Sequence, residues 1–139
     1  MFRLKPRSSV CLWEKSLRNV RWEGSLIYTE LTRDVFEQCG AAPVEAEGMV
    51  NFLVGTEGSL VAAILYAIDE GWRVSMRSIR PEVDVAAISA VFGGGGHPRA
   101  AGCTVVGGEA ERDAFVRKVA ELASAAVADV DGPPSHHGA

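Results

Sequence analysis

The residues best suited to chemistry lie in the stretch VFGGGGHPRAAGC, from Val91 to Cys103. Four consecutive glycines do not favour folding, because glycine loses more backbone entropy on folding than any other residue. Successive glycines can, however, turn several backbone N–H groups toward one point and form a nest that binds an anion. His97 adds hydrogen-bond donors beside such a nest, and Arg99 adds a fixed positive charge. The stretch predicts a phosphate-binding loop, with a helix end that runs into a plain glycine turn as the alternative.

A second pair of polar residues lies on a predicted strand. In VSMRS (Val74–Ser78), Ser75 and Arg77 occupy alternate positions and therefore face the same side of that strand. An arginine fork matches two phosphate oxygens, although an arginine in mid-strand is also a common solvent-exposed residue. If the strand and the loop end near one another, both sets of donors converge on one phosphate. The predicted binding set is Ser75, Arg77, Gly94, Gly95, Gly96, His97 and Arg99.

Two common phosphate-binding loops do not fit this context. The dinucleotide-binding fingerprint follows a strand and opens a helix, whereas this loop follows a predicted helix and leads into a strand. The Walker A loop ends in Gly-Lys-Ser or Gly-Lys-Thr, and no lysine lies near these glycines. The predicted loop is therefore of another kind.

Residues that could perform catalysis are not evident. His97 has no acid nearby in the sequence to orient it as part of a nucleophilic triad. His136 and His137 lie in a segment rich in glycine, proline and serine, with no acid beside them. The acid pairs fit other roles, such as the hairpin tip at Asp69 and the helix cap at Asp84. We predict no catalytic residue and no metal ligand, and a chain that binds its ligand without cutting it.

Alternating helices and strands must position these residues. Apolar spacing predicts helices near residues 11–20, 33–39, 45–54, 85–92 and 109–127, and strands at 25–31 and 100–106. Two β-rich runs that flank the sequence DEG predict a hairpin over residues 60–79. Thr32 and Asp84 are predicted N-caps, and Gly40 and Gly93 are predicted helix ends. This order predicts an α/β fold, a single domain with a mixed sheet of about four or five strands flanked by helices.

Length and composition favour one globular domain. The chain has 139 residues, of which 47% are hydrophobic and 23% charged. We expect an irregular basic N-terminus over residues 1–9, the domain over 10–127, and a disordered tail over 128–139. No apolar run approaches the roughly 18 residues of a membrane span, and residues 1–10 lack the apolar segment of a secretory signal. We therefore expect a cytoplasmic protein that does not enter membranes.

Charge and cysteine content narrow the choice of partners. The formal net charge of −4 opposes binding to long duplex DNA, so an anion site should be a small pocket. Cys11, Cys39 and Cys103 are an odd number, widely spaced and without a CxxC pair. We expect free thiols rather than a disulfide framework or a zinc site.

The motif GGGHPRAAG (Gly94–Gly102), preceded by SMRS, resembles the GGGHxxAAG and SxRS motifs of the DHH-associated C-terminal domain (type 1) of DHH phosphoesterases. Within that family the chain is most similar to the nanoRNase/oligoribonuclease and pAp-phosphatase group, over roughly residues 10–127. The resemblance implies that Arg77 and the loop 94–97 hold substrate phosphate, supported by Ser75 and Arg99. Asn51 matches a position near the substrate, although an amide on a helix surface is the plainer interpretation.

The resemblance also implies a division of labour. Hydrolysis in the family uses two manganese or magnesium ions held by a separate catalytic DHH domain, so we expect no cofactor in this chain. Its expected ligands are short single-stranded nucleic acid or nucleoside bisphosphates, presented to that catalytic domain. A dimerisation or docking domain is an alternative, because related domains end alanyl-tRNA synthetases. A chain that is itself a hydrolase is the third hypothesis.

Overall fold

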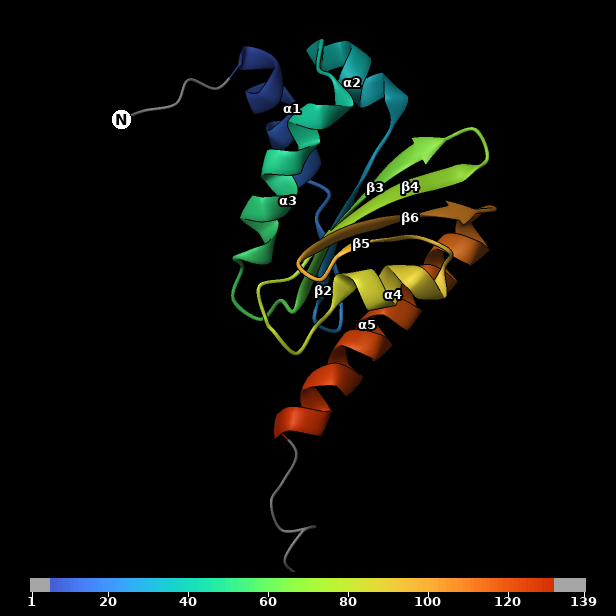
Figure 1. Cartoon of the computed structure of the whole chain (residues 1–139). Coiled ribbons are helices and arrows are strands. Elements are labelled where there is room, and N and C mark those ends of the chain that lie inside the picture. Colours follow the sequence, from blue (N-terminus) through green and yellow to red (C-terminus); the bar gives the residue numbers. More distant parts are fainter. Residues whose placement is uncertain (1–5, 132–139) are drawn as a thin grey trace, which may run out of the picture.

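A six-stranded mixed sheet forms the middle layer of the fold (Figure 1), and the computed structural model describes residues 6–131. Across the sheet the strands run in the order β1-β2-β3-β4-β6-β5. Strands β2 and β3 pair in parallel, and the other neighbours are antiparallel. The strands are β1 (Arg21–Glu23), β2 (Leu26–Leu31), β3 (Val61–Ile68), β4 (Gly71–Arg77), β5 (Gly95–His97) and β6 (Ala100–Val106).

Helices pack on both faces of this sheet (Figure 1). Between β2 and β3 the chain forms α2 (Arg33–Cys39), the short 3-10 helix η1 (Pro43–Ala46) and α3 (Glu47–Val54), which lie on one face together with α1 (Arg7–Leu17). The other face is covered by α4 (Val85–Val91) and α5 (Glu109–Asp131). The arrangement confirms the predicted α/β fold with a mixed sheet.

The sheet separates two hydrophobic cores. The core under α4 and α5 takes side chains from β2, β3, β4 and β6, including Leu65, Met76 and Cys103. The core under α1, α2 and α3 takes strand residues from β2 and β3, such as Ile27 and Ile64. No buried residue of β4, β5 or β6 belongs to that second core within the described part of the chain.

Beyond β4, this sheet face therefore has no helix of the described chain over it, and at β4 itself α3 reaches only the side that faces β3. We call this part of the sheet the open half-face: the side of β4, β6 and β5 that carries Arg73, Ser75, Arg77, Ala100, Gly102, Thr104, Gly95 and His97. Alternation along a strand explains its composition, because the intervening residues Val74 and Met76 are buried under α4 and α5. Helix α3 borders the open half-face on the side of β3.

The predicted helix boundaries agree with the structure where a specific cap was identified. The Thr32 hydroxyl accepts a hydrogen bond from the Val35 amide at 3.3 Å, and Gly40 ends α2 with φ +62°. The Asp84 carboxylate accepts from the amides of Ala86 and Ala87 at 2.9 and 3.0 Å. Capping by these residues confirms the predicted positions of α2 and α4.

Other expectations need correction. The sheet has two short strands that were not predicted, β1 and β5. Each has only three residues, which are too few to display an alternating pattern. Helix α1 begins at Arg7, inside the segment expected to be irregular, and α5 runs to Asp131, past the expected end at residue 127. The helix predicted over 45–54 is split into η1 and α3. Val91, in the helix predicted over 85–92, is 58% exposed although it is apolar.

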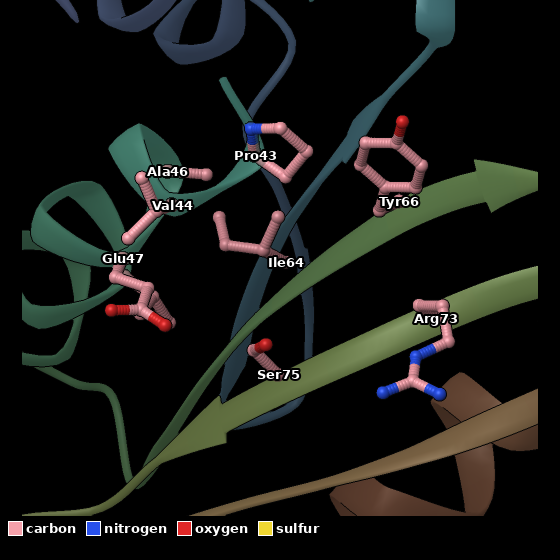
Figure 2. Close-up of a pocket in the computed structure, with 9 residues that line it drawn as sticks. Pro43, Val44, Ala46, Glu47, Ile64, Tyr66, Arg73 and Ser75 are labelled. Carbon is pink, nitrogen blue, oxygen red and sulfur yellow. The ribbon is translucent and has the colours of Figure 1, made fainter.

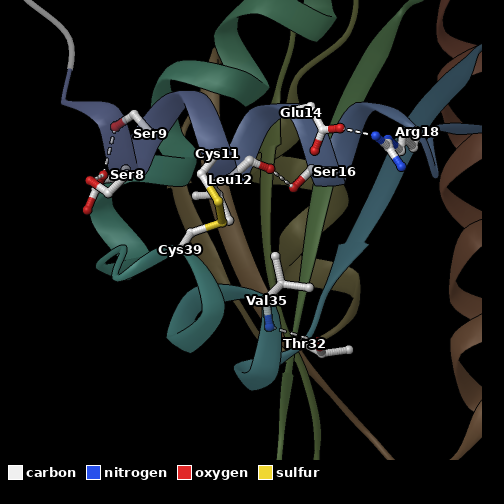
Figure 3. Close-up of a disulfide and its surroundings, with 11 residues drawn as sticks. Ser8, Ser9, Cys11, Leu12, Glu14, Ser16, Arg18, Thr32, Val35 and Cys39 are labelled. Carbon is white, nitrogen blue, oxygen red and sulfur yellow. Dashed lines mark hydrogen bonds and ion pairs between the residues drawn. A yellow bond between two sulfur atoms is a disulfide. The ribbon is translucent and has the colours of Figure 1, made fainter.

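The expectation of three free thiols is wrong for two of them. Cys11 and Cys39 form a disulfide between α1 and α2, with their Cα atoms 5.5 Å apart (Figure 3). Adjacent packing of the two helices brings the side chains within the range that a disulfide requires. Cys103 is free and buried, as expected.

The expectations for the two chain ends concern residues of which the structure describes only some. Residues 1–5 and most of the predicted tail, 132–139, lie outside the described residues, including His136 and His137. Among the described residues, no helix combines the length and the apolar character that a membrane span needs.

Candidate functional site

Four predicted site residues lie on the open half-face at matched positions: Ser75 and Arg77 of β4, and Gly95 and His97 of β5. Gly96, in register with the buried Ala101, lies on the opposite face. Arg77 of β4 is in register with Ala100 of β6, and Ala100 is in register with His97 of β5. Neighbouring strands are about 4.8 Å apart, so the backbones of Arg77 and His97 are roughly 10 Å apart with a small alanine between them. We call these three residues the Arg77–His97 row. Two long polar side chains thus border a gap that Ala100 leaves open.

A second matched set lies one step further along the strands. Ser75 is in register with Gly102, and Gly102 with Gly95. The two glycines have no side chains, so the sheet surface beside Ser75 is bare backbone. Together with the Arg77–His97 row, this set forms a polar surface with a low centre, which suits a ligand lying against the strands.

Side-chain contacts hold Arg77 in place. Its Nε donates to Asn51 Oδ1 of α3 at 3.1 Å. Its Nη1 donates to the carbonyl oxygen of the preceding residue, Met76, at 3.0 Å. A guanidinium has five N–H groups, and three on Nη1 and Nη2 have no partner among the described residues. Asn51 is therefore a positioning residue for the arginine rather than an unrelated surface amide. A fixed fork of this kind can bind two oxygens of one phosphate.

The glycine run does not form the predicted nest. The amides of Gly93 and Gly94 donate to Ala90 O at 3.1 Å and Ser89 O at 2.9 Å, which closes the end of α4. Gly95, Gly96 and His97 form β5, an edge strand paired with β6. The amides of the glycine run therefore cannot all turn toward one anion. Two of them donate to carbonyls at the end of α4, and the others belong to a strand that pairs with β6.

Close packing explains two of the four consecutive glycines, Gly94 and Gly96. A Cβ added at Gly94 would lie 2.2 Å from Gly102 O, and one at Gly96 would lie 2.8 Å from Ala101 Cα. Gly93 ends α4 with φ +80°, a conformation that favours glycine. Gly95 differs from the other three glycines, because its φ is not positive and a Cβ there would meet nothing within 4 Å. Neither the backbone conformation nor close packing requires glycine at this position. Gly95 lies on the open half-face.

The structure shows contacts of Arg99 within the fold that were not predicted. Its guanidinium donates to the carbonyls of Arg80 and Pro81, and its own carbonyl accepts from the Ser78 amide at 3.1 Å. The hydrogen bonds of Arg99 therefore connect the loop after β4 to the turn between β5 and β6. These contacts use two of the five N–H groups of the guanidinium, so the supporting phosphate contact expected of Arg99 stays a prediction.

A cavity of about 420 Å³ opens beside Ser75, between the η1–α3 segment and strands β3 and β4 (Figure 2). Arg73, Tyr66 and Glu47 line it in addition to Ser75. These three residues are not among the predicted site residues. Alternation along β4 was the available signal for Arg73, since it shares a face with Ser75 and Arg77.

Metal ligands are not gathered anywhere in residues 6–131. No group of three or more His, Cys, Asp or Glu side chains is arranged there to hold a metal ion. The described residues therefore do not fit a two-metal hydrolytic site, which needs several carboxylate and imidazole ligands close together. We assign no hydrolytic step to them.

Similar folds occur in proteins of several activities. An exopolyphosphatase-related protein from Bacteroides fragilis matches with a TM-score of 0.77 and 20% identity, over 89% of this chain and 37% of that protein. A pGpG-specific phosphodiesterase from Vibrio cholerae matches with a TM-score of 0.52 and 13% identity, over 88% and 40%. The C-Ala domain of the Aquifex aeolicus alanyl-tRNA synthetase matches with a TM-score of 0.53 and 16% identity, over 76% and 98%.

These likenesses concern the fold, since all three identities are low. The chain spans less than half the length of the first two proteins and corresponds to nearly all of the third domain. A family model described as the DHHA1 domain matches residues 23–125, which include β2 to β6 and most of α5. Because this match covers most of the chain, including the strands that form the open half-face, the protein belongs to the DHHA1 domain family.

Proposed function

We propose that this domain binds the phosphate of short single-stranded nucleic acids or nucleoside bisphosphates and presents it to a catalytic DHH domain. The observation that carries the proposal is the Arg77–His97 row on the open half-face. It combines a guanidinium whose orientation is fixed by Asn51, an exposed imidazole, and a gap above Ala100. Binding at such a surface needs no nest of free amides.

Electrostatics support a small phosphate ligand rather than a long duplex. Arg73 and Arg77 lie on the same side of β4, while the net charge of the chain is −4. A local pair of arginines on an acidic protein attracts a short anion, whereas the whole molecule repels an extended polyanion. Membership of the DHHA1 family and the likeness to two phosphoesterase-related folds support the same ligand class.

The test is an NMR titration of the isotopically labelled protein with an unlabelled dinucleotide. We expect amide shifts at Arg77, at residues 94–97 and at Ala100. Arg77→Gln should weaken binding about tenfold or more, because hydrogen bonds to a charged group contribute roughly 1.5–3 kcal/mol. Arg117→Gln is the matched control, since Arg117 is an exposed arginine on α5. Absence of shifts on the open half-face at millimolar ligand would refute the proposal.

A docking or dimerisation role is the second candidate, favoured by the same uncovered surface. Ile79, two residues after the end of β4, is 64% exposed, and Phe52 on α3 is 58% exposed. Apolar residues beside an uncovered sheet half are typical of a surface that another protein covers. Light scattering of the purified chain would distinguish the two, because a stable dimer over this surface would leave no room for a nucleotide. A manganese-dependent assay on a dinucleotide tests the further hypothesis that the chain hydrolyses its ligand by itself.

A further inference from the structure

The cavity beside Ser75 has the size and lining of a ligand site. Its volume of about 420 Å³ falls within the range of small-molecule pockets, which is about 300–1,000 Å³. Pro43 and Val44 of η1 form one wall, and Ile64 and Tyr66 of β3 contribute to the other (Figure 2). These groups offer apolar surface for a flat ring.

Two charged groups of opposite sign accompany these apolar walls. The Glu47 carboxylate lies on the α3 side of the cavity and the Arg73 guanidinium on the β4 side, with the Ser75 hydroxyl between them (Figure 2). Neither Glu47 nor Arg73 makes a hydrogen bond or ion pair with another described residue, and both are exposed. A carboxylate only accepts hydrogen bonds and a guanidinium only donates them. The cavity therefore suits a ring that carries a donor on one edge and an acceptor on another.

The cavity is continuous with the proposed phosphate surface through Ser75. Ser75 and Arg77 are two positions apart on β4, a separation of roughly 6.6 Å along the strand. That separation is less than the length of one nucleotide. A ligand whose phosphate lies at the Arg77–His97 row can therefore extend its remaining part into the cavity.

We propose that this cavity binds the base of that nucleotide and prefers bases that carry a ring N–H, guanine and uracil, over adenine and cytosine. The proposal rests on the phosphate-binding function proposed above. Glu47 accepts from the ring N–H of guanine or uracil, whereas the corresponding ring nitrogen of adenine or cytosine is an acceptor that the carboxylate repels. Arg73, on the other side of Ser75, donates to an acceptor on another edge of the base, such as N7 of guanine or an oxygen of uracil.

The experiment compares five ligands on the intact chain by NMR titration: the 5′-monophosphates of guanosine, uridine, adenosine and cytidine, and ribose 5-phosphate. Ribose 5-phosphate has the phosphate without a base, so it reports on the Arg77–His97 row alone. We expect guanosine and uridine monophosphate to bind at least fivefold more tightly than the other three ligands. Their titration should shift the amides of residues 43–47 and of Ser75, and ribose 5-phosphate should leave residues 43–47 unchanged.

Two substitutions test the assigned contacts. Glu47→Gln should bring the four nucleotides within about twofold of one another, because an amide can donate as well as accept. Arg73→Gln should weaken guanosine monophosphate about fivefold and ribose 5-phosphate by less than about twofold, because Arg73 acts on that phosphate only through its charge. The matched controls are Glu37→Gln on α2 and Arg117→Gln on α5, both exposed residues away from the cavity, and neither should alter any affinity.

The outcomes separate this inference from the proposed function. Equal binding of all five ligands, with Arg77→Gln still weakening each, leaves the phosphate site in place and overturns the base pocket. A preference for guanosine and uridine that survives Glu47→Gln also overturns it. If none of the ligands binds, ribose 5-phosphate included, the phosphate site and the base pocket are both wrong.

Discussion

Gly94 and Gly95 are neighbours in the chain with opposite surroundings. A side chain at Gly94 would collide with the backbone oxygen of Gly102 at 2.2 Å and with Cys103 Cβ at 2.6 Å. A side chain at Gly95 would point into open space over the bare part of the sheet. The first glycine is thus required by the fold, and the second is available to a ligand.

This difference predicts opposite results for two alanine substitutions. Gly94→Ala should lower the free energy of unfolding by about 1–3 kcal/mol or more, because β5 and β6 would have to move apart. Gly95→Ala should change it by less than about 0.5 kcal/mol, as surface substitutions usually do, yet weaken dinucleotide binding. Urea denaturation measures the first quantity and NMR titration the second. Equal stability losses in the two variants would contradict the assigned packing.

Cys103 is a residue whose burial sets its chemistry. Its side chain lies in the core under α4 and α5, and burial raises the pKa of this thiol to about 11, with a smaller opposing effect of Arg73. A raised pKa stabilises the fold below pH 9, and this contribution is lost as the pH rises from the ordinary value of 9.0 toward 11.

The thiolate is the form that reacts with iodoacetamide, so Cys103 should be alkylated slowly in the native protein. At pH 8 we expect a rate about a hundredfold below that of the urea-unfolded chain, from the difference in thiolate fraction alone. Mass spectrometry of timed samples gives both rates, with the disulfide intact as an internal control. Similar rates in the folded and unfolded protein would place Cys103 at the surface and refute its assigned burial.

At the scale of elements, a disulfide and a carboxylate help to hold α1 against the rest of the fold (Figure 3). The disulfide joins Cys11 to Cys39 at the end of α2. Glu45 in η1 accepts hydrogen bonds from the hydroxyls of Ser8 and Ser9, at 2.5 and 2.7 Å, and from the Ala42 amide. These bonds, that of Ser8 above all, hold the pKa of Glu45 below its ordinary value of 4.5. The stabilisation exists above about pH 4.5 and is lost as the pH falls through the lower folded value.

Removing the disulfide should destabilise the domain without changing its fold. The two cysteines are 28 residues apart, and cross-linking a loop of that length stabilises by about 3–4 kcal/mol in the chain-entropy model. The double variant Cys11→Ser, Cys39→Ser should therefore unfold at lower urea concentration, and dithiothreitol should shift the wild type to the same midpoint. A midpoint unaffected by dithiothreitol would show that the two thiols are not joined in solution. Disulfides are typical of oxidising compartments, so the cytoplasmic location stays a prediction.

At the scale of the whole molecule, the arrangement of layers leaves one surface for function. Helices α4 and α5 cover one face of the sheet, and α1, α2 and α3 cover the part of the other face that β2 and β3 form (Figure 1). The open half-face is what remains. A ligand or a partner protein that buries this surface would complete the third layer of the fold.

Hydrogen exchange should show this asymmetry directly. With a saturating dinucleotide, we expect slower exchange in residues 73–77 and 94–102, and unchanged exchange along α5, which packs on the opposite face. Repeating the measurement without ligand at two protein concentrations distinguishes nucleotide binding from self-association, because only the latter depends on protein concentration. Protection confined to α5 would place the ligand on the wrong face and contradict the proposed function.

Much of the fold could be predicted because its signals are local. The caps Thr32 and Asp84, the helix-ending Gly40 and the alternation of Val74 and Met76 each act over a few residues, and the structure confirms them. Strand β5 could not be predicted, because Gly95 and Gly96 have low strand propensity and pair only when β6 lies beside them. The binding role assigned to the site residues stays a prediction.

The sequence by itself determined the order of helices and strands, the side of β4 on which Ser75 and Arg77 lie, and the motif that relates the chain to its family. These follow from periodicity, capping and residue type, which are properties of neighbouring residues. Only the tertiary structure decided that Cys11 meets Cys39, that Arg99 fastens a loop, that Asn51 orients Arg77, and that a cavity lined by Arg73 and Glu47 adjoins Ser75. Each of these depends on the packing of segments far apart in the chain, and the spacing of residues along a sequence does not specify such packing.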